Sequence, residues 1–277
     1  MHWETVAIVG VGLMGGSIGL ALRRRHLARE VVGVGRRMAT LRVARKLGAV
    51  TRTTLDLERG VAHAELVVVC TPVGQIVADV RRVAAACDAL ITDVGSTKAS
   101  IVRGVAKLKG PPRYVGSHPL AGSERNGPGA ATAERVVGRV VVITPTAWAR
   151  REDCRMVRRL WQGLGARCVE MTAEEHDACV AAISHLPHLT AAALAGSTPA
   201  EAVRLAAQGW RDTTRVASGD ARLWREILLD NRRNVLERLD EYLGRLGAFR
   251  RALSAGDGSV LERLLCEGKR RRDAVGS

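Results

Sequence analysis

Val6–Gly19 reads VAIVGVGLMGGSIG, so four apolar residues lead directly into three glycines spaced as Gly10-x-Gly12-x-x-Gly15. This pattern predicts a strand, a tight turn and the start of a helix. Gly10 permits the turn, Gly12 lets a pyrophosphate approach the backbone, and Gly15 lets the helix pack closely on the strand. Because the free N–H groups at the start of a helix attract phosphates, the stretch predicts a dinucleotide-binding site.

The second strand indicates which dinucleotide binds. Val31–Val34 is the next apolar run, and a unit that binds NAD usually ends this strand with an acidic residue that holds the ribose 2′-hydroxyl. Here Gly35, Arg36 and Arg37 follow instead. An acid would repel a 2′-phosphate, whereas two guanidinium groups can bind it. We therefore predict NADP as the preferred cofactor with NAD also possible, the alternative being two solvated arginines in an arginine-rich chain.

Strands and helices alternate up to residue 171, which predicts a parallel, doubly wound sheet in a Rossmann-type domain. The later strands are expected at 64–70, 89–93, 113–116, 139–144 and 166–171. Thr71 and Pro72 follow the first of these, and ligands bind beyond the carboxyl ends of parallel strands, so both should border the nicotinamide. Ser96 or Thr97 is expected to cap a helix over 99–108. The predicted cofactor-binding residues are Gly10, Gly12, Leu13, Met14, Gly15, Arg36, Arg37, Thr71 and Pro72.

From Thr172 onward the sequence predicts helices alone. Thr172 precedes Ala173–His176 and is expected to cap a helix. Apolar residues recur further on at the spacing of an amphipathic helix; they are Leu223, Ile227, Leu228, Val235, Leu239, Tyr242, Leu243 and Leu246. We therefore expect a dinucleotide-binding domain over residues 1–171 and a helical domain over residues 172–277, with a frayed basic tail from Gly268.

The composition favours an ordinary globular protein. The 277 residues carry a formal charge of +15, but the arginines are spread along the chain and form no nucleic-acid-binding motif. The six cysteines include no CxxC pair, which favours free thiols in a reducing cytoplasm over disulfides or a zinc site. We find no signal peptide before the first strand and no apolar run long enough to span a bilayer. A cytoplasmic protein without a membrane or nucleic-acid partner is expected.

His118 is the first candidate for chemistry. It follows the strand expected at 113–116, so it should lie at the ligand-facing edge of the sheet. A neutral imidazole there can accept the proton of a substrate hydroxyl while a hydride leaves the same carbon. Ser96, at the end of a neighbouring strand, is placed to orient His118 through a hydrogen bond. By itself, however, a histidine after a strand is more often structural than catalytic.

Two further segments carry polar candidates. His185 and His188 form an HxxH pair, but no third ligand accompanies them at a suitable spacing, so we predict no metal site. Polar side chains on an otherwise apolar helix indicate a cleft instead. Arg215 can bind a carboxylate through two parallel hydrogen bonds. The alternative interpretation is that Arg215 is one more surface arginine without a ligand.

Six motifs, taken together and in this order, resemble the prephenate and arogenate dehydrogenases of tyrosine biosynthesis over nearly the whole chain. They are Val9–Ser17, Cys70–Pro72, Asp93–Lys98, Gly116–Glu124, Ser184–His188 and Arg211–Arg215. The first two are shared with other dehydrogenases, whereas the Asp-Val-Gly-Ser-x-Lys, Gly-Ser-His-Pro and Ser-His-Leu-Pro-His motifs are much more specific.

The resemblance implies the oxidative decarboxylation of a cyclohexadienol that carries a ring carboxylate and a ring hydroxyl. A hydride passes to the nicotinamide, carbon dioxide leaves, and the ring becomes aromatic. By resemblance, His118 polarises the hydroxyl, Ser96 supports His118, and Arg215 binds a substrate carboxylate. The resemblance also implies a homodimer formed by the helical domain. It places four further residues in or near the substrate pocket: His188, His185, Ser123 and Trp224.

The sequence leaves the preference between prephenate and arogenate open. Many relatives carry Asp where Gly35 stands, which puts the use of NAD in doubt, and the length leaves no room for a fused mutase or regulatory domain. One alternative is another NADP-dependent hydroxyacid or imine reductase. Such a reductase would typically need a lysine of the helical domain as its general acid, and the only lysine there, Lys269, lies in the expected tail. The other is a non-catalytic NADP-sensing or nucleic-acid-binding module, which would leave His118, His188 and Arg215 without a joint purpose.

Overall fold

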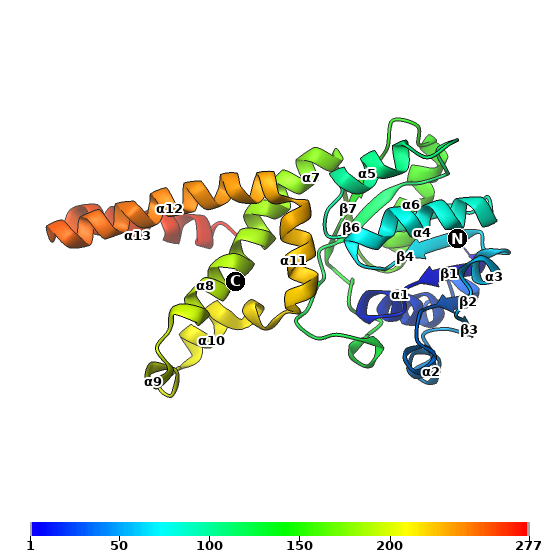
Figure 1. Ribbon diagram of the computed structural model, residues 1–277, viewed down its shortest axis with the longest axis horizontal. Coiled ribbons are helices and arrows are strands. Elements are labelled where there is room, and N and C mark those ends of the chain that lie inside the picture. Colours follow the sequence, from blue (N-terminus) through cyan, green and yellow to red (C-terminus); the bar gives the residue numbers. More distant parts are fainter. Residues whose placement is uncertain (1, 276–277) are drawn as a thin grey trace. The chain divides into compact units, whose positions relative to one another are not determined.

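The structure is a computed structural model that describes residues 2–275 (Figure 1). The chain divides into two compact units, residues 1–231 and residues 232–277. The first unit contains a five-stranded parallel sheet in the order β3-β2-β1-β4-β5. Its strands are β1 (Trp3–Val9), β2 (Ala28–Val34), β3 (Arg52–Thr54), β4 (Leu66–Val69) and β5 (Leu90–Asp93). The strand order reverses between β1 and β4, which is where folds of this topology bind their ligands.

Helices cover both faces of this sheet, which explains why its strands are almost continuously apolar. Successive residues of a strand point to opposite faces, so Val6 and Ile8 join one buried layer while Ala7 and Val9 join the other. The first layer is completed by α1 (Leu13–Arg24), α2 (Met38–Lys46) and α6 (Arg151–Gly163). The second is completed by α3 (Leu57–Val61), α4 (Val73–Ala86) and α5 (Ala99–Ala106).

A second sheet of three strands carries the histidine predicted to be catalytic. It consists of β6 (Gly116–Pro119), β7 (Val140–Thr144) and β8 (Arg167–Glu170), with β6 antiparallel and β8 parallel to β7. The strand predicted at 113–116 was therefore placed too early, and His118 lies within β6 rather than after it. Gly116, Ser117 and Pro119 have little intrinsic preference for strands, so pairing with β7 decides their conformation.

The segment between β6 and β7 is irregular apart from the 3-10 turn η1 (Pro128–Ala130), whereas the part of the first unit that follows β8 is helical. Its elements are α7 (Ala173–Val180), the π-helical turn η2 (Ala181–His185), α8 (Leu186–Ser197), α9 (Ala200–Val203), α10 (Gln208–Thr214), the 3-10 turn η3 (Arg215–Ser218) and α11 (Ala221–Asp230). Thr172 caps α7 as predicted, because its hydroxyl accepts from Glu175 N at 3.1 Å while the Glu175 carboxylate accepts from Thr172 N at 2.8 Å. The widened turn η2 ends two residues before Pro187, which has no N–H to donate within a regular helix.

The start of α5 is capped from a distance. The prediction that Ser96 or Thr97 caps this helix was wrong, because no side chain of the N-cap region does so. The backbone N–H groups of Lys98 and Ala99 donate instead to the Asp177 carboxylate, at 2.7 and 2.9 Å. A cap supplied by a residue so far along the chain leaves no local pattern in the sequence.

The second unit is a pair of helices, α12 (Arg232–Ala255) and α13 (Gly258–Asp273). Between them Gly256 adopts a φ of +64°, and the Asp257 side chain caps α13 by accepting from Val260 N at 3.0 Å. The helix continues to Asp273, so the predicted frayed tail from Gly268 was wrong over that range, and residues 276 and 277 lie outside the described residues. Basic residues in a last helical turn favour the helix because they oppose its dipole.

One helical stretch, Ala173–Ser197, is long and apolar enough to cross a membrane by length and composition alone. Its mean hydropathy is 1.4, which contradicts the expectation that no apolar run reaches that length. A core helix of a soluble protein meets the same criterion, so the feature is weak evidence for a membrane span. The stretch also carries the buried polar side chains of His176, Asp177 and His185.

Candidate active site

The loop after β1 has the steric character that a bound dinucleotide requires. Gly10 adopts a φ of +94°, and a Cβ there would lie 2.8 Å from the carbonyl oxygen of Cys70. A Cβ on Gly15 would lie 2.3 Å from the carbonyl oxygen of Gly10, so only glycine allows α1 to approach the turn this closely. A Cβ on Gly12 would meet nothing within 4 Å. The open space beside Gly12, at the uncapped N-terminus of α1, fits a pyrophosphate.

The two arginines after β2 line a cavity of about 730 Å³ together with Pro72. Neither Arg36 nor Arg37 forms an ion pair with another described residue, so both guanidinium groups are available to an anion. A Cβ on Gly35 would lie 3.0 Å from Leu41 Cδ2, so an acidic side chain there requires Leu41 to move. The remaining lining residues are Asn126, Asp220, Arg222, Leu223 and Glu226.

The Thr71 and Pro72 segment lies where the sequence placed it, directly after β4. The Thr71 hydroxyl donates to Asp79 Oδ2 at 2.7 Å, which ties it to α4, and Pro72 precedes the first residue of that helix. Since β1 and β4 are neighbours, this segment and the glycine loop share one edge of the sheet.

A cavity of about 370 Å³ brings most of the predicted substrate and catalytic residues together. Its lining includes Ser96, His118, Ser123, His185, Arg215 and Trp224. His188 is not part of this lining. It stacks instead on Trp224, with ring centroids 3.6 Å apart and an interplanar angle of 13°. Its Nδ1 is buried without a hydrogen-bond partner among the described residues.

His118 is a neutral histidine at neutral pH. Its side chain is 8% exposed, and burial, reinforced by the neighbouring His176 and Lys98, holds the pKa of His118 well below its usual value. Its Nδ1 lies 2.8 Å from His176 Nε2, whereas the sequence had suggested Ser96 as its partner. Ser96 lines the same cavity, so its supporting role stays a prediction. A neutral imidazole with one nitrogen left for a ligand has the chemistry of a general base.

His185 presents a hydrogen-bond donor. The amide nitrogen of Asn231 donates to the carbonyl oxygen of Asp177 at 2.7 Å, which sets the orientation of that amide. The same nitrogen lies 3.1 Å from His185 Nδ1, so Nδ1 accepts and the hydrogen of the neutral ring is on Nε2. Burial lowers the pKa of His185 to about 4, which keeps the ring neutral at neutral pH.

Arg215 lies on η3, and its side chain is 61% exposed. Its Nη1 contacts Glu124 Oε2 at 3.2 Å, and Glu124 lines the cavity as well. The only sequence signal for Glu124 was its place at the end of the Gly116–Glu124 motif. A carboxylate in the cavity would compete with Glu124 for this guanidinium.

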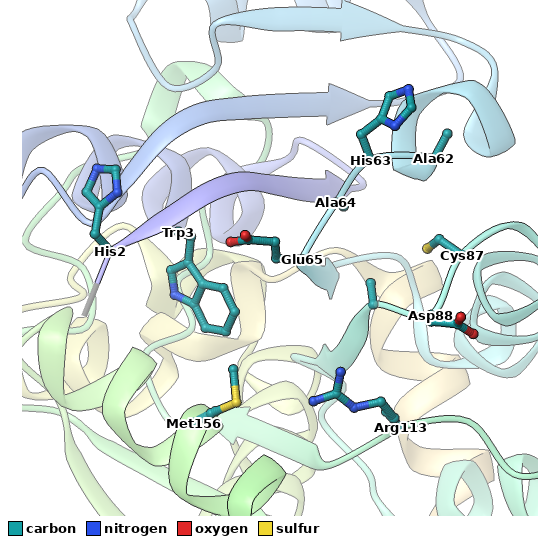
Figure 2. A pocket seen from close by; sticks show the side chains of 11 residues that line it. His2, Trp3, Ala62, His63, Ala64, Glu65, Cys87, Asp88, Arg113 and Met156 are labelled. Atoms are coloured by element: carbon teal, nitrogen blue, oxygen red, sulfur yellow. The ribbon is translucent and has the colours of Figure 1, made fainter.

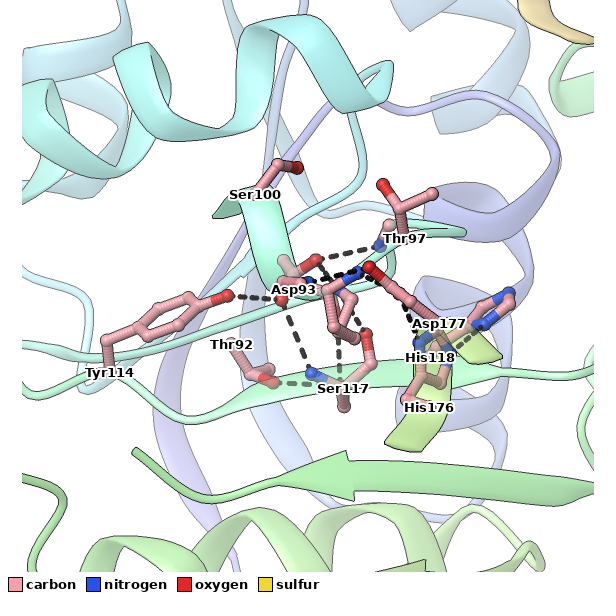
Figure 3. Close-up of polar contacts among 12 residues, drawn as sticks. Thr92, Asp93, Thr97, Ser100, Tyr114, Ser117, His118, His176 and Asp177 are labelled. Atoms are coloured by element: carbon pink, nitrogen blue, oxygen red, sulfur yellow. Dashed lines mark hydrogen bonds and ion pairs between the residues drawn. The ribbon is translucent and has the colours of Figure 1, made fainter. Parts of the chain in front are cut away.

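A buried polar network that sequence reasoning missed holds the backbone of β6 (Figure 3). Lys98 and Asp93 are both fully buried and form an ion pair. The Tyr114 hydroxyl donates to Asp93 Oδ1 at 2.7 Å, and Lys98 Nζ donates to the carbonyl oxygen of Ser117 at 3.0 Å. Because Ser117 precedes His118, this network fixes the backbone from which the histidine projects.

A further cavity lies at the opposite edge of the parallel sheet (Figure 2). It has a volume of about 770 Å³ and is lined by residues that precede β1, β4, β5 and β6, among them His2, Glu65, Asp88 and Arg113. Ligands of such sheets bind at the carboxyl ends of the strands rather than the amino ends. None of the predicted site residues lines this cavity.

A glycine loop at the carboxyl end of β1, together with a cavity that holds a neutral histidine, is typical of the nicotinamide-dependent dehydrogenases. Residues 18–170 match the family model of the prephenate dehydrogenase nucleotide-binding domain, and residues 172–267 match that of the prephenate dehydrogenase dimerization domain. The chain therefore belongs to the prephenate dehydrogenase family.

Individual relatives agree with this assignment. The chain is 34% identical to the prephenate dehydrogenase of Bacillus subtilis, over 98% of this chain and 76% of that protein. The crystal structure of prephenate dehydrogenase from A. aeolicus in complex with hydroxyphenyl propionate and NAD+ superposes with a TM-score of 0.91 at 28% identity, over 99% of both chains. Synechocystis arogenate dehydrogenase superposes with a TM-score of 0.81 at 30% identity, over 98% of this chain and 100% of that one. The predicted class of fold, a Rossmann-type domain followed by a helical one, is confirmed.

Proposed function

We propose that this protein catalyses the oxidative decarboxylation of prephenate, arogenate or both, and that it prefers NADP to NAD. The products are carbon dioxide, reduced cofactor and either 4-hydroxyphenylpyruvate or tyrosine. The observation that carries the proposal is the cavity in which neutral His118 lies with Arg215 and His185, in a chain of the prephenate dehydrogenase family. The alternative of a hydroxyacid or imine reductase is not favoured, because the motifs and family models agree on this family.

His118 is the proposed general base. Its Nε2 takes the proton of the ring hydroxyl while the hydrogen on the same carbon leaves as hydride. The bond from the ring to its carboxylate then breaks, carbon dioxide departs, and the electron pair of that bond makes the ring aromatic. The ring oxygen recovers the proton, so His118 ends neutral and the only net transfer is the hydride. The bound nicotinamide supplies the hydride acceptor.

Arg215 and His185 are the proposed carboxylate ligands. The guanidinium offers two parallel donors, and His185 offers its Nε2–H from the neighbouring wall. Substrate binding would exchange the Glu124 partner of Arg215 for a substrate carboxylate. Ser123 and Trp224 line the same cavity, and His188 is proposed to act at its border by stacking on Trp224.

The proposed cofactor site combines the glycine loop with the arginines after β2. The backbone N–H groups at Leu13, Met14 and Gly15 begin α1 and would face the pyrophosphate. The unpaired guanidinium groups of Arg36 and Arg37 support NADP, because a 2′-phosphate is the anion they would bind. The A. aeolicus relative is in complex with NAD+, so the preference needs a direct test.

We also propose a cytoplasmic homodimer with a boundary between residues 171 and 172. The two family models meet at this boundary, and the second model is a dimerization domain. The second unit of the structure carries exposed leucines on its helices, including Leu243, Leu253 and Leu265, which a partner subunit would cover.

The test is reduced-cofactor absorbance in a four-way grid of NAD or NADP with prephenate or arogenate. We expect turnover in at least one NADP reaction, faster than in the matching NAD reaction. The His118→Asn variant should lower kcat by roughly 10²- to 10⁴-fold and keep its affinity for NADP. Four silent reactions would refute the proposed function, whereas an active wild type with an equally active His118→Asn variant would refute the role of His118.

A further inference from the structure

Two buried residues of α7 continue the hydrogen bond that begins at His118 (Figure 3). His118 Nδ1 lies 2.8 Å from His176 Nε2, and His176 Nδ1 lies 2.8 Å from Asp177 Oδ1. His176 is 0% exposed and Asp177 is 3% exposed. Neither lines the 370 Å³ cavity, so neither contacts a ligand there directly, whereas His118 does line it.

The Asp177 carboxylate is held in its ionised form. It accepts from the backbone N–H groups of Lys98 and Ala99, at the N-terminus of the eight-residue helix α5. Although burial raises it, the pKa of Asp177 lies below its usual value because of the hydrogen bonds from His176, Ala99 and Lys98. The helix dipole favours a negative charge at this position as well.

This carboxylate determines where the hydrogens lie on both imidazoles. An ionised carboxylate can only accept, so Nδ1 of His176 carries a hydrogen. The tautomer of His176 that carries its hydrogen on Nδ1 accepts at Nε2, and Nδ1 of His118 is then the donor in their contact. The lone pair of His118 is then on Nε2, which has no hydrogen-bond partner among the described residues. The contacts select the tautomer that can accept a proton from a ligand.

We propose that His176 and Asp177 are positioning residues that hold His118 in this tautomer and stabilise its imidazolium when Nε2 takes the hydroxyl proton. The proposal rests on the proposed function. In that step the O–H bond of the substrate breaks and an N–H bond forms at Nε2, while the hydrogen on Nδ1 stays in its contact with His176. Burial and the neighbouring His176, Lys98 and His185 all disfavour a positive charge on His118, and the Asp177 carboxylate, which contacts His176, supplies the compensating negative charge.

The tautomer itself can be measured without turnover. We would record nitrogen-15 spectra of the full-length protein with labelled histidine and assign His118 by its loss in His118→Asn. We expect the Nδ1–H tautomer in the wild type, and a shift toward the Nε2–H form in His176→Phe, which keeps a ring but removes the acceptor. An Nε2–H tautomer in the wild type, or an unchanged His118 signal in His176→Phe, would overturn the proposal whether or not the proposed function holds.

Kinetics provide the second test. We expect His176→Phe to lower kcat by roughly 10- to 100-fold, a part of what a general base contributes, with a changed pH profile and near-normal KM and NADP affinity. Asp177→Asn should act in the same direction, and the double variant should lose little more than the worse single variant. The matched control is Thr97→Val, which removes a buried hydroxyl that donates to Asp230 at 2.6 Å. An equal loss of kcat in Thr97→Val, or a loss in His176→Phe confined to KM and thermal stability, would overturn the proposal.

Discussion

Replacing Lys98 by methionine should destabilise the protein strongly. Methionine approximates the length of lysine but removes the ammonium group that pairs with Asp93, and both side chains are fully buried. Asp93 keeps hydrogen bonds from the Tyr114 hydroxyl at 2.7 Å and from Gly95 N at 2.8 Å, but it loses its counter-charge. Removing one partner of a buried ion pair typically costs about 3–5 kcal/mol.

The measurement is the free energy of unfolding in urea, at one protein concentration because residues 172–267 match the model of a dimerization domain. A loss of this size should also lower the unfolding midpoint by roughly 10 °C. Lys107→Met is the matched control, since Lys107 is an exposed lysine at the end of the same helix and should change stability by no more than about 0.5 kcal/mol.

The double variant Lys98→Met, Asp93→Asn separates charge from packing. Once both charges are gone, no unpaired ion remains, so this variant should recover part of the stability that Lys98→Met loses. A single variant within about 1 kcal/mol of the wild type would refute the reasoning. A double variant less stable than Lys98→Met would show that hydrogen bonds, rather than the uncompensated charge, dominate at Asp93.

Two other perturbations address the cofactor and pH. Arg36→Ala should weaken the binding of NADP by roughly 10- to 100-fold, because one charge-assisted contact is lost, and should weaken the binding of NAD much less. The measurement is a fluorescence titration with each cofactor, and Arg42→Ala is the exposed control. Equal losses of affinity for both cofactors would mean that Arg36 does not bind the 2′-phosphate. Burial lowers the pKa of His185 from 6.5 to about 4, so between these pH values the unfolded chain binds a proton that the folded chain does not. The contribution of neutral His185 to the free energy of unfolding is therefore complete above pH 6.5 and disappears as the pH falls toward 4. The free energy of unfolding should therefore drop by up to about 3 kcal/mol across this window, less so in His185→Gln, and a rise on acidification would contradict this sign.

Features that depend on a few consecutive residues could be predicted from the sequence. The spacing of Gly10, Gly12 and Gly15 predicted a turn and a close approach, and the structure shows the crowding that only glycine tolerates at Gly10 and Gly15. Thr172 and Glu175 form the predicted cap because both partners lie within one helical turn. The apolar strands of the parallel sheet were visible because helices cover both faces.

Features that depend on distant partners could not be predicted. Gly116–Pro119 forms a strand because β7 pairs with it, although its own residues do not favour one. The hydrogen-bond partner of His118 lies 58 residues further along the chain, and His176 looked like an ordinary polar residue in the first turns of a helix. A polar residue at a helix start is usually solvated, so only the packing of α7 against α5 and β7 reveals that His176 is buried.

Lys98 connects the buried polar network around Asp93 to the residues that position His118. Its backbone N–H donates to Asp177, and its ammonium group contacts both Asp93 and the carbonyl oxygen of Ser117. The residue therefore joins the end of β5, the start of α5, the strand that carries His118 and the helix that carries His176. Since the contacts of Lys98 also fix the backbone beside His118, the proposed base, a substitution of Lys98 should lower turnover even at temperatures where the protein remains folded. We therefore expect the free energy of unfolding and the turnover to fall together in variants of Lys98.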